Sequence, residues 1–275
     1  MERDLGRLIC VLRLASRHWL PMSPFDLSGT VALITGGNGG IGLGMAEGLA
    51  AAGADVCIWG RNAEKNEAAV AGLTAHGTRV EAMVVDVADE GAVDGAFAAT
   101  VDRLGRVDAC FANAGIIGAG SRFADVTEDE WRAVTGINLD GVFLTLRAAV
   151  RHLMHRGEGG SLVATSSLSS VLGMPRGSAY SSSKAAVSAL VRSIAVEYGR
   201  YGIRANAIVP GWIETDMTAA IMTDERFQRS QLGRTSLKRW GRPDDFAGIA
   251  VYLASDASRF HTGDTIVIDG GYLVD

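Results

Sequence analysis

Short apolar runs alternate with longer segments of helical period from residue 31 to the end of the chain. The runs are rich in Val, Ile and Ala and contain few polar residues, which is typical of strands buried on both faces of a sheet. They are VALITGG from residue 31, ADVCIWG from 54, VEAMVVDV from 80, VDACFANAG from 107, SLVATSS from 161, RANAIVPG from 204 and DTIVIDGG from 264.

Between these runs, apolar residues recur at the three- and four-residue spacing of helices. Regular alternation of helix with buried strand predicts an α/β fold, a doubly wound Rossmann fold with a seven-stranded parallel sheet and helices on both faces. No linker or repeat divides residues 23–275, so we expect one domain there. The predicted helices are Ile41–Ala52, Ala63–Ala75, Glu90–Leu104, Glu128–His155, Ala179–Tyr198 and Pro243–Ala254.

The first 22 residues do not follow this pattern. They mix arginines with leucines, and the strand–helix pattern begins only after Phe25. We expect a poorly packed N-terminal extension, upstream of a natural start at Met22. The alternative is a short amphipathic helix for targeting or surface association, against which Glu2 and Asp4 argue.

Composition narrows the class of protein. Of 275 residues, 48% are hydrophobic and 21% charged, so a sizeable core is expected. A net charge of −5 argues against nucleic-acid binding, and the apolar runs are too short for a membrane span. Cys10, Cys57 and Cys110 show neither CxxC spacing nor a histidine cluster, so we expect no metal site and a reducing, cytoplasmic location.

A glycine-rich loop, TGGNGGIG, follows the first strand directly and opens a helix. Glycine lets the backbone turn tightly and approach a pyrophosphate, whose charge is favoured by the amides of a helix N-terminus. A flexible glycine loop alone would be weak evidence, but its place between strand and helix indicates a dinucleotide site. The candidate residues are Gly36, Asn38, Gly39, Gly40, Ile41 and Gly42.

The second strand ends at Gly60, followed by Arg61 and Asn62. Folds that choose the unphosphorylated cofactor usually carry an acid here, for the ribose hydroxyls. A guanidinium instead holds a 2′-phosphate by charge-assisted hydrogen bonds. We therefore predict NADP(H), with NAD(H) as the alternative. Arg61 would otherwise be the solvated start of the next helix.

The ends of the third and fourth strands supply further candidates. Asp86 and Val87 are placed to meet the adenine, although Asp86 could equally cap the following helix. Asn113, Ala114 and Gly115 are small groups that permit close backbone approach. Both sets lie on the edge of the sheet where α/β folds bind ligands.

The candidate reacting groups are Tyr180 and Lys184, one helical turn apart and thus on the same face. Ser167 ends the preceding strand. A neighbouring cation lowers the pKa of a tyrosine, which becomes a usable general acid for a ketone or base for an alcohol. Ser167 would hold the substrate oxygen, and Lys184 the nicotinamide ribose. The alternative is a surface pair of little energetic value.

Taken together, these motifs resemble the short-chain dehydrogenase/reductase family of single-domain enzymes, from about Phe25 to Asp275. The chain has the family's TGxxxGxG loop, its Asn-Ala-Gly, and its Ser…Tyr-x-x-x-Lys. The resemblance implies a homotetramer built on the long helices. It also implies that Asn138 kinks a helix and anchors a proton-relaying water. Finally, it implies cofactor contacts from a Pro-Gly segment, namely Pro210, Gly211, Ile213 and Thr215.

The segment PGWIETDMT is most similar to that of 3-oxoacyl-(acyl-carrier-protein) reductases of fatty acid biosynthesis. We therefore expect a ketone or secondary alcohol as substrate, a 3-oxoacyl thioester first. In that subfamily basic residues dock the acyl-carrier protein; the candidates here are Arg156, Arg200 and Arg204, unless they form an ordinary solvated face.

Two other functions stay open. One is a sugar or polyol dehydrogenase, or a general carbonyl reductase, of the same family. The other is a redox sensor that binds the dinucleotide without turnover. The variable segment from Thr218 to Trp240, with the nearby Met217, Met222 and Phe227, is expected to form a lid over the substrate.

Overall fold

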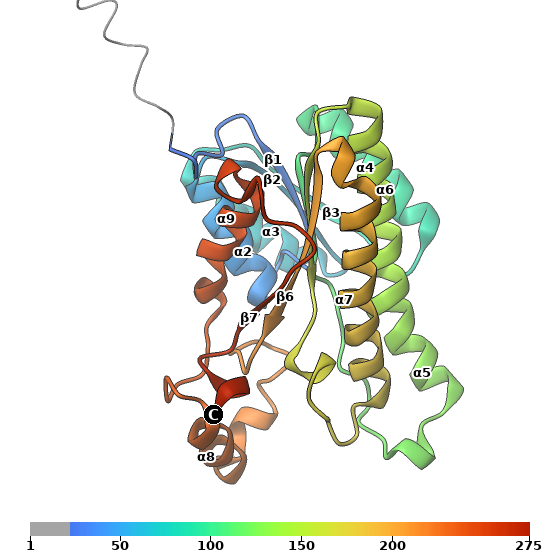
Figure 1. Cartoon of the computed structure of the whole chain (residues 1–275), viewed down its shortest axis with the longest axis vertical. Helices are drawn as coiled ribbons and strands as arrows, with labels where there is room; N and C mark the ends of the chain where they lie inside the picture. The colour runs from blue at the N-terminus through green and yellow to red at the C-terminus, as the bar shows by residue number, and fades with distance from the viewer. Residues whose placement is uncertain (1–22) are drawn as a thin grey trace, which may run out of the picture.

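The computed structural model describes residues 23–275, and the N-terminal extension lies outside them. Seven parallel strands form one sheet in the order β3-β2-β1-β4-β5-β6-β7, as the alternating pattern predicts. Figure 1 shows the sheet edge-on between two helical layers. The strands are β1 (Val31–Thr35), β2 (Asp55–Gly60), β3 (Val80–Val84), β4 (Ala109–Ala112), β5 (Gly160–Thr165), β6 (Ile203–Pro210) and β7 (Thr265–Ile268).

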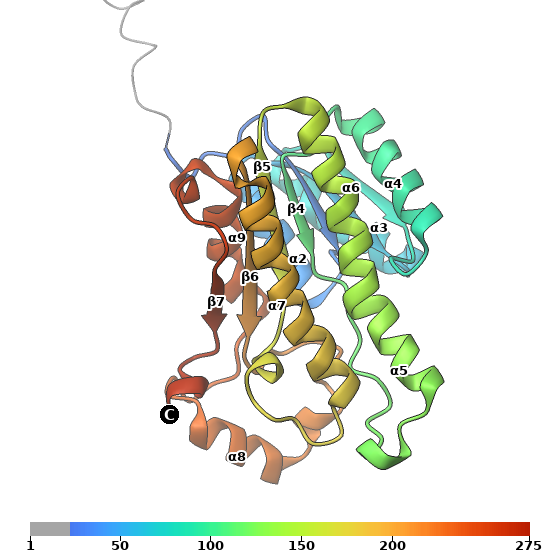
Figure 2. The same ribbon diagram turned by 45° about the vertical axis from the view of Figure 1, so that its right-hand side comes forward.

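Helices α2, α3 and α9 cover one face of the sheet, and α4, α6 and α7 cover the other (Figures 1 and 2). Each face buries its own apolar cluster, one with Met45 and Leu49 of α2, the other with Phe97 of α4 and Val187 of α7. The helices are α2 (Gly40–Ala51), α3 (Ala63–Leu73), α4 (Glu90–Leu104), α5 (Glu128–Thr135), α6 (Gly141–Arg156), α7 (Ser178–Tyr198), α8 (Glu225–Arg234) and α9 (Ala247–Ala254).

The strand order reverses direction between β1 and β4. After β1 the chain enters α2 on one face, whereas after β4 it continues to α5 and α6 on the other. This divergence opens a crevice at the carboxyl ends of the strands, where open α/β sheets bind ligands. Helix α8 and the C-terminus lie at that same edge, the lower one in Figure 2.

The predicted helix Glu128–His155 is one continuous helix to Arg156 with a π-turn, η3 (Gly136–Asp140), between α5 and α6. Among residues 23–275 it is the one helix long and apolar enough to pass as a membrane span. Its apolarity has a different cause, because Leu146 and Leu153 of α6 are buried in the core. It is a core helix of the fold.

Helix α8 lies inside the segment that we expected to form a lid. Its sequence, ERFQRSQLGR, has no apolar stripe, and none of its residues is buried. It is held at its start by Asp224, whose carboxylate accepts from the backbone N–H groups of Arg226 and Phe227 at 2.9 and 3.1 Å. The apolar pattern could not predict this helix, because the helix has no buried residue and its start is set by the Asp224 cap.

Candidate active site

A cavity of 1040 Å³ opens at the carboxyl edge of the sheet. Its walls come from the glycine loop, the ends of β4, β5 and β6, the start of α7, and the α8 region. Sixteen of the predicted site residues line it: Gly36, Asn38, Gly39, Gly40, Ile41, Arg61, Asn113, Ala114, Gly115, Ser167, Tyr180, Lys184, Pro210, Gly211, Ile213 and Thr215.

The glycine loop has the geometry of a phosphate cradle. Gly36 and Gly40 adopt positive φ, +65° and +50°. A Cβ on Gly42 would lie 2.1 Å from the carbonyl oxygen of Gly36, so only glycine lets helix and loop approach this closely. Gly39 caps α2 without a side-chain acceptor, and the first turn carries no acid. The amides at this N-terminus are therefore available to an anion, and the loop fits a dinucleotide pyrophosphate.

Two basic side chains flank the nucleotide end of the cavity. Arg61 lines it, is exposed, and makes no hydrogen bond or ion pair with any residue in 23–275. Lys65, in the first turn of α3, also lines the cavity and pairs with Asp216 at 2.5 Å. We did not predict Lys65, and helical spacing does not relate it to Arg61, because Arg61 precedes the helix. Asn38 is fixed by donating to Asn66 Oδ1 at 2.7 Å.

Besides Gly42, three predicted cofactor residues do not line the cavity. Asn62 caps α3, its side chain accepting from the backbone N–H of Lys65 at 2.9 Å. The Asp86 carboxylate is exposed and accepts from Ala88 N–H at 3.0 Å, in the turn before α4. Val87 is only 6% exposed and packs in the core. Each thus has a structural task, and their contact with the cofactor stays a prediction.

Asn113 ties together the ends of three strands. Its side-chain N–H donates to the carbonyl oxygen of Thr35 at 3.1 Å, and its Oδ1 accepts from the Thr165 hydroxyl at 3.0 Å. In return, the Thr35 hydroxyl accepts from the backbone N–H groups of Asn113 and Ala114, both at 3.0 Å. These hydrogen bonds fix the wall of the cavity beside the reacting groups.

Ser167, Tyr180 and Lys184 meet on one wall of the cavity. Lys184 is 3% exposed, and its ammonium donates to the carbonyl oxygen of Thr165 at 2.7 Å. It lies 5.8 Å from the centre of the Tyr180 ring. Burial lowers the pKa of Lys184 to about 8, because a charged ammonium loses its hydration there.

The pKa of Tyr180 differs from our expectation. We predicted that the neighbouring lysine would lower it. Instead burial raises the pKa of Tyr180, and a hydrogen bond with Ser167 lowers it in part. Desolvation of the phenolate is the larger effect here. In the structure described, Tyr180 is therefore held protonated, as a proton donor must be.

Asn138 lies directly behind this wall. It is fully buried in the π-turn, and its side chain exchanges two hydrogen bonds of 2.8 Å with the backbone of Ile116. A Cβ on Gly115 would lie 3.1 Å from Asn138 Oδ1 and 3.4 Å from Lys184 Nζ. The side chain thus holds the loop after β4 beside the lysine, although it does not line the cavity.

The far side of the cavity is aromatic and partly polar. The Trp212 ring packs edge-on against Phe227 at 5.1 Å and against Trp240 at 5.8 Å, between centroids. Of the expected lid residues, Met217 and Phe227 line the cavity and Met222 does not. Sequence reasoning missed four polar residues of the cavity lining, Ser169, Gln231, Arg234 and Tyr272.

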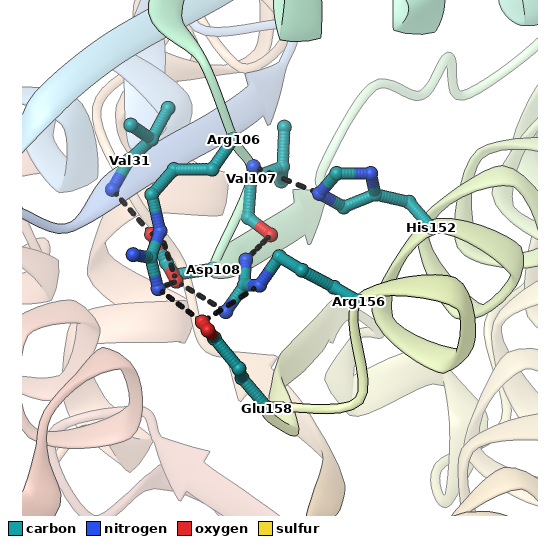
Figure 3. Close-up of polar contacts among 7 residues, drawn as sticks. All are labelled: Val31, Arg106, Val107, Asp108, His152, Arg156 and Glu158. Atoms are coloured by element: carbon teal, nitrogen blue, oxygen red, sulfur yellow. Dashed lines mark hydrogen bonds and ion pairs between the residues drawn. The ribbon is translucent and has the colours of Figure 1, made fainter.

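The arginines expected at the mouth of the site lie elsewhere. Arg156 is partly buried beside the start of β4, where it bonds to Asp108 Oδ1 at 2.7 Å and to the Val107 carbonyl at 2.8 Å (Figure 3). Arg204, at the start of β6, donates to Ser258 and Leu253. Arg200 stacks on Tyr201, just before β6. Parallel strands begin at the edge opposite the site, so the expectation that these residues dock a carrier protein there is wrong.

No candidate metal site is found among the residues that the structure describes. Within residues 23–275, no group of three or more His, Cys, Asp or Glu side chains is arranged to hold a metal ion.

Comparison with known proteins agrees with the geometry. The family model described as "Enoyl-(Acyl carrier protein) reductase" matches residues 36–273. The chain is 40% identical to a sorbose reductase of Schizosaccharomyces pombe over 254 residues, which cover 91% of this chain and 98% of that protein. It is 34% identical to a 3-oxoacyl-[acyl-carrier-protein] reductase of Chlamydia pneumoniae over 245 residues, which cover 89% and 97%.

Among solved structures, a gluconate 5-dehydrogenase from Burkholderia cenocepacia, in complex with NADP and tartrate, superposes with a TM-score of 0.87. The two chains are 37% identical, and the match covers 92% of this chain and 98% of the other. On the family match, the identities and the shared fold, the chain belongs to the short-chain dehydrogenase/reductase family and is an NAD(P)-dependent oxidoreductase.

Proposed function

We propose that the protein is an NADP(H)-dependent oxidoreductase that interconverts a ketone and a secondary alcohol on a sugar, sugar acid or polyol. The observation that carries the choice is the polar wall that Gln231, Arg234 and Tyr272 form in the lining of the cavity. Polyhydroxylated substrates need such hydrogen-bonding partners. The sorbose reductase and the gluconate 5-dehydrogenase are also more similar to this chain, at 40% and 37%, than the 3-oxoacyl reductase at 34%.

In this proposal Tyr180 donates its phenolic proton to the carbonyl oxygen during reduction, and recovers it during oxidation. The Ser167 hydroxyl binds the same oxygen. A nicotinamide bound along the glycine loop would supply or accept the hydride. The buried Lys184 ammonium is held by the Thr165 carbonyl oxygen and lies 5.8 Å from the centre of the Tyr180 ring, beside the reacting phenol. Asn138 positions the loop beside it and acts through that position.

Arg61 and Lys65 support NADP(H) over NAD(H). Both line the nucleotide end, and Arg61 has no acidic partner among residues 23–275. A 2′-phosphate is the group that two adjacent cations would favour there. The acid that typically selects NAD is replaced by Gly60, at the end of β2.

A 3-oxoacyl thioester as substrate, our first expectation, has less support. Its basic docking residues do not lie near the site, and the polar wall offers more hydrogen-bonding groups than an acyl chain uses. The sensor without turnover is disfavoured because Ser167, Tyr180 and Lys184 all line one cavity.

We further propose a cytoplasmic homotetramer. Cys57 and Cys110 are free and buried, which suits a reducing compartment.

Trp131 and Phe143 lie exposed on the long helix Glu128–Arg156, the kind of surface that subunit contacts cover. Light scattering is expected to give four times the chain mass of 28.8 kDa, and the mass of one chain would contradict assembly.

The function is tested by a substrate panel that pairs each ketone with NADPH and with NADH. We expect turnover of 5-keto-D-gluconate or sorbose with NADPH, and little with acetoacetyl thioesters. Faster reduction of the thioester would reinstate the first expectation. Firm NADPH binding with no turnover of any substrate would instead favour the sensor.

A further inference from the structure

Three side chains on the far side of the cavity form one hydrogen-bonded group, here called the donor array: Gln231, Arg234 and Tyr272. Gln231 and Arg234 are three residues apart on α8 and so share a face. The Tyr272 hydroxyl donates to Gln231 Oε1 at 2.7 Å and accepts from Arg234 Nη1 at 2.9 Å. All three line the cavity that holds Tyr180.

Tyr272 is a fixed platform for this array. It is 6% exposed and packs with Leu168 and Val209. The Asp269 carboxylate fixes the surrounding turn by accepting from the backbone N–H groups of Gly271 and Leu273 at 2.8 and 2.7 Å. The guanidinium carbon of Arg234 lies 4.3 Å from the centre of the Tyr272 ring, a cation–π contact. The guanidinium is thus held in place before any ligand binds.

The array presents donors and positive charge to the cavity. Among residues 23–275, no acidic side chain pairs with Arg234, and only one of its N–H groups is used, on Tyr272. The Gln231 oxygen is occupied by the Tyr272 hydroxyl, which leaves its amide N–H groups free to donate. Among residues 23–275 that line the cavity, Asp216 is the only acidic one, and it pairs with Lys65. An anion is the ligand such a surface complements.

The end of helix α8 does not account for Arg234. A cation in the last turn of a helix is favourable by itself, because it faces the negative end of the helix dipole. Here the terminal carbonyls have other partners. Thr235 N–H donates to those of Gln231 and Leu232, and the Lys238 ammonium donates to that of Gly233 at 2.6 Å.

We propose that the donor array binds a carboxylate of the substrate, so that Arg234 and Gln231 select keto acids of the sugar series over neutral ketoses. The planar guanidinium matches a carboxylate by two parallel hydrogen bonds. This inference rests on the proposed function, a polyhydroxylated ketone substrate, and assigns the charge of that substrate. Tyr272 already holds Gln231 and Arg234 in place, so these side chains lose little conformational freedom when a ligand binds. This favours a ligand whose geometry matches the array.

Arg234→Met tests this by removing the donors and charge while keeping an unbranched chain over Tyr272. For 5-keto-D-gluconate we expect kcat/KM to fall roughly 10- to 100-fold, mainly through KM, because a charged hydrogen bond to bound substrate is lost. For sorbose, which can make only neutral hydrogen bonds to the array, the loss should be at least about threefold smaller than for the keto acid. Arg229→Met is the matched control, since Arg229 lies on the same helix, pairs with Glu225 and does not line the cavity. Equal losses on both substrates would overturn the proposal.

A binding measurement separates this inference from the proposed function. With NADPH bound, D-gluconate cannot be oxidised, so calorimetry reports its binding alone. We expect gluconate to bind the wild type more tightly than sorbitol does, and to lose at least tenfold affinity in Arg234→Met. That result would support the array even if no sugar were turned over. Gluconate binding that is unchanged in the variant would overturn it. Stronger Arg234-dependent binding of sorbitol 6-phosphate would assign a phosphate in place of the carboxylate.

Discussion

At the scale of single residues, the site depends on groups whose chemistry is set by burial. Tyr180 and Lys184 are neighbours by helical spacing, but their pKa values move in the directions that desolvation imposes, up for the phenol and down to about 8 for the ammonium. Both shifts favour the neutral forms. The phenol therefore holds its proton until a substrate oxygen accepts it.

Replacing Tyr180 by Phe removes the proton donor and little else. We expect kcat to fall by roughly 10²- to 10⁴-fold, the usual contribution of a general acid. NADPH affinity, followed by fluorescence quenching, should stay within about threefold, because we propose that the glycine loop and Arg61 carry most of the cofactor binding. Turnover close to the wild-type rate would refute the assignment of Tyr180 as the donor.

Arg61→Ala addresses cofactor choice at the same scale. Loss of charge-assisted bonds to a 2′-phosphate should raise KM for NADPH roughly 10- to 100-fold and leave KM for NADH nearly unchanged. Arg79→Ala serves as control, because Arg79 pairs with Asp55 and does not line the cavity. Equal effects on the two cofactors would remove Arg61 from the 2′-phosphate site.

At the scale of elements, the π-turn places a polar side chain inside the core. The turn η3 contains one residue more than a regular α-helical turn. Asn138 lies in this turn, and its side chain bonds the backbone of Ile116 in the loop after β4. The sequence suggested Asn138 only through family resemblance. The reason that an amide is needed is visible in the two backbone groups of Ile116 that it satisfies.

Asn138→Ala should therefore destabilise the fold by about 1–3 kcal/mol, because buried backbone groups of Ile116 lose their partners. Urea unfolding followed by circular dichroism measures this. Arg132→Ala, on the exposed face of α5, breaks a surface pair with Glu128 and should cost less than about 1 kcal/mol. Comparable losses in the two variants would contradict the role of the amide.

At the scale of the whole molecule, the two edges of the sheet have different tasks. The carboxyl edge holds the cavity, while the amino edge carries an ion cluster of Arg106, Asp108, Arg156 and Glu158 (Figure 3). Asp108 also accepts from Val31 N–H at 2.9 Å and so joins β1 to the start of β4. This cluster accounts for Arg156, one of the three arginines that the sequence alone allowed at the active site.

His152 makes this edge sensitive to pH. Its Nε2 accepts from Val107 N–H at 3.2 Å, and burial together with Arg156, His155 and Arg106 lowers its pKa, which Asp108 raises in part. The folded state therefore binds this proton less readily than the unfolded state. The contribution to stability is complete above the ordinary histidine pKa, near 6.5, and is lost as pH falls through the folded-state value.

Thermal unfolding between pH 7.5 and 5 measures the effect. We expect the decrease in Tm toward low pH to be shallower in His152→Gln than in the wild type. His155→Gln, which changes an exposed neighbour on the same helix, should follow the wild type. An unchanged slope in His152→Gln would mean that other groups set the pH dependence.

The amino-acid sequence by itself determined the strand–helix alternation, the glycine loop and the pairing of Tyr180 with Lys184, because each depends on spacing along a few turns of chain. Only the tertiary structure decided which distant residues meet. It brought Tyr272 against Arg234 and Gln231, tied Asn113 to Thr35 and Thr165, and placed Arg156 and Arg204 on the opposite edge. Such contacts, and the pKa values that burial sets, follow from packing between elements, which local periodicity does not encode.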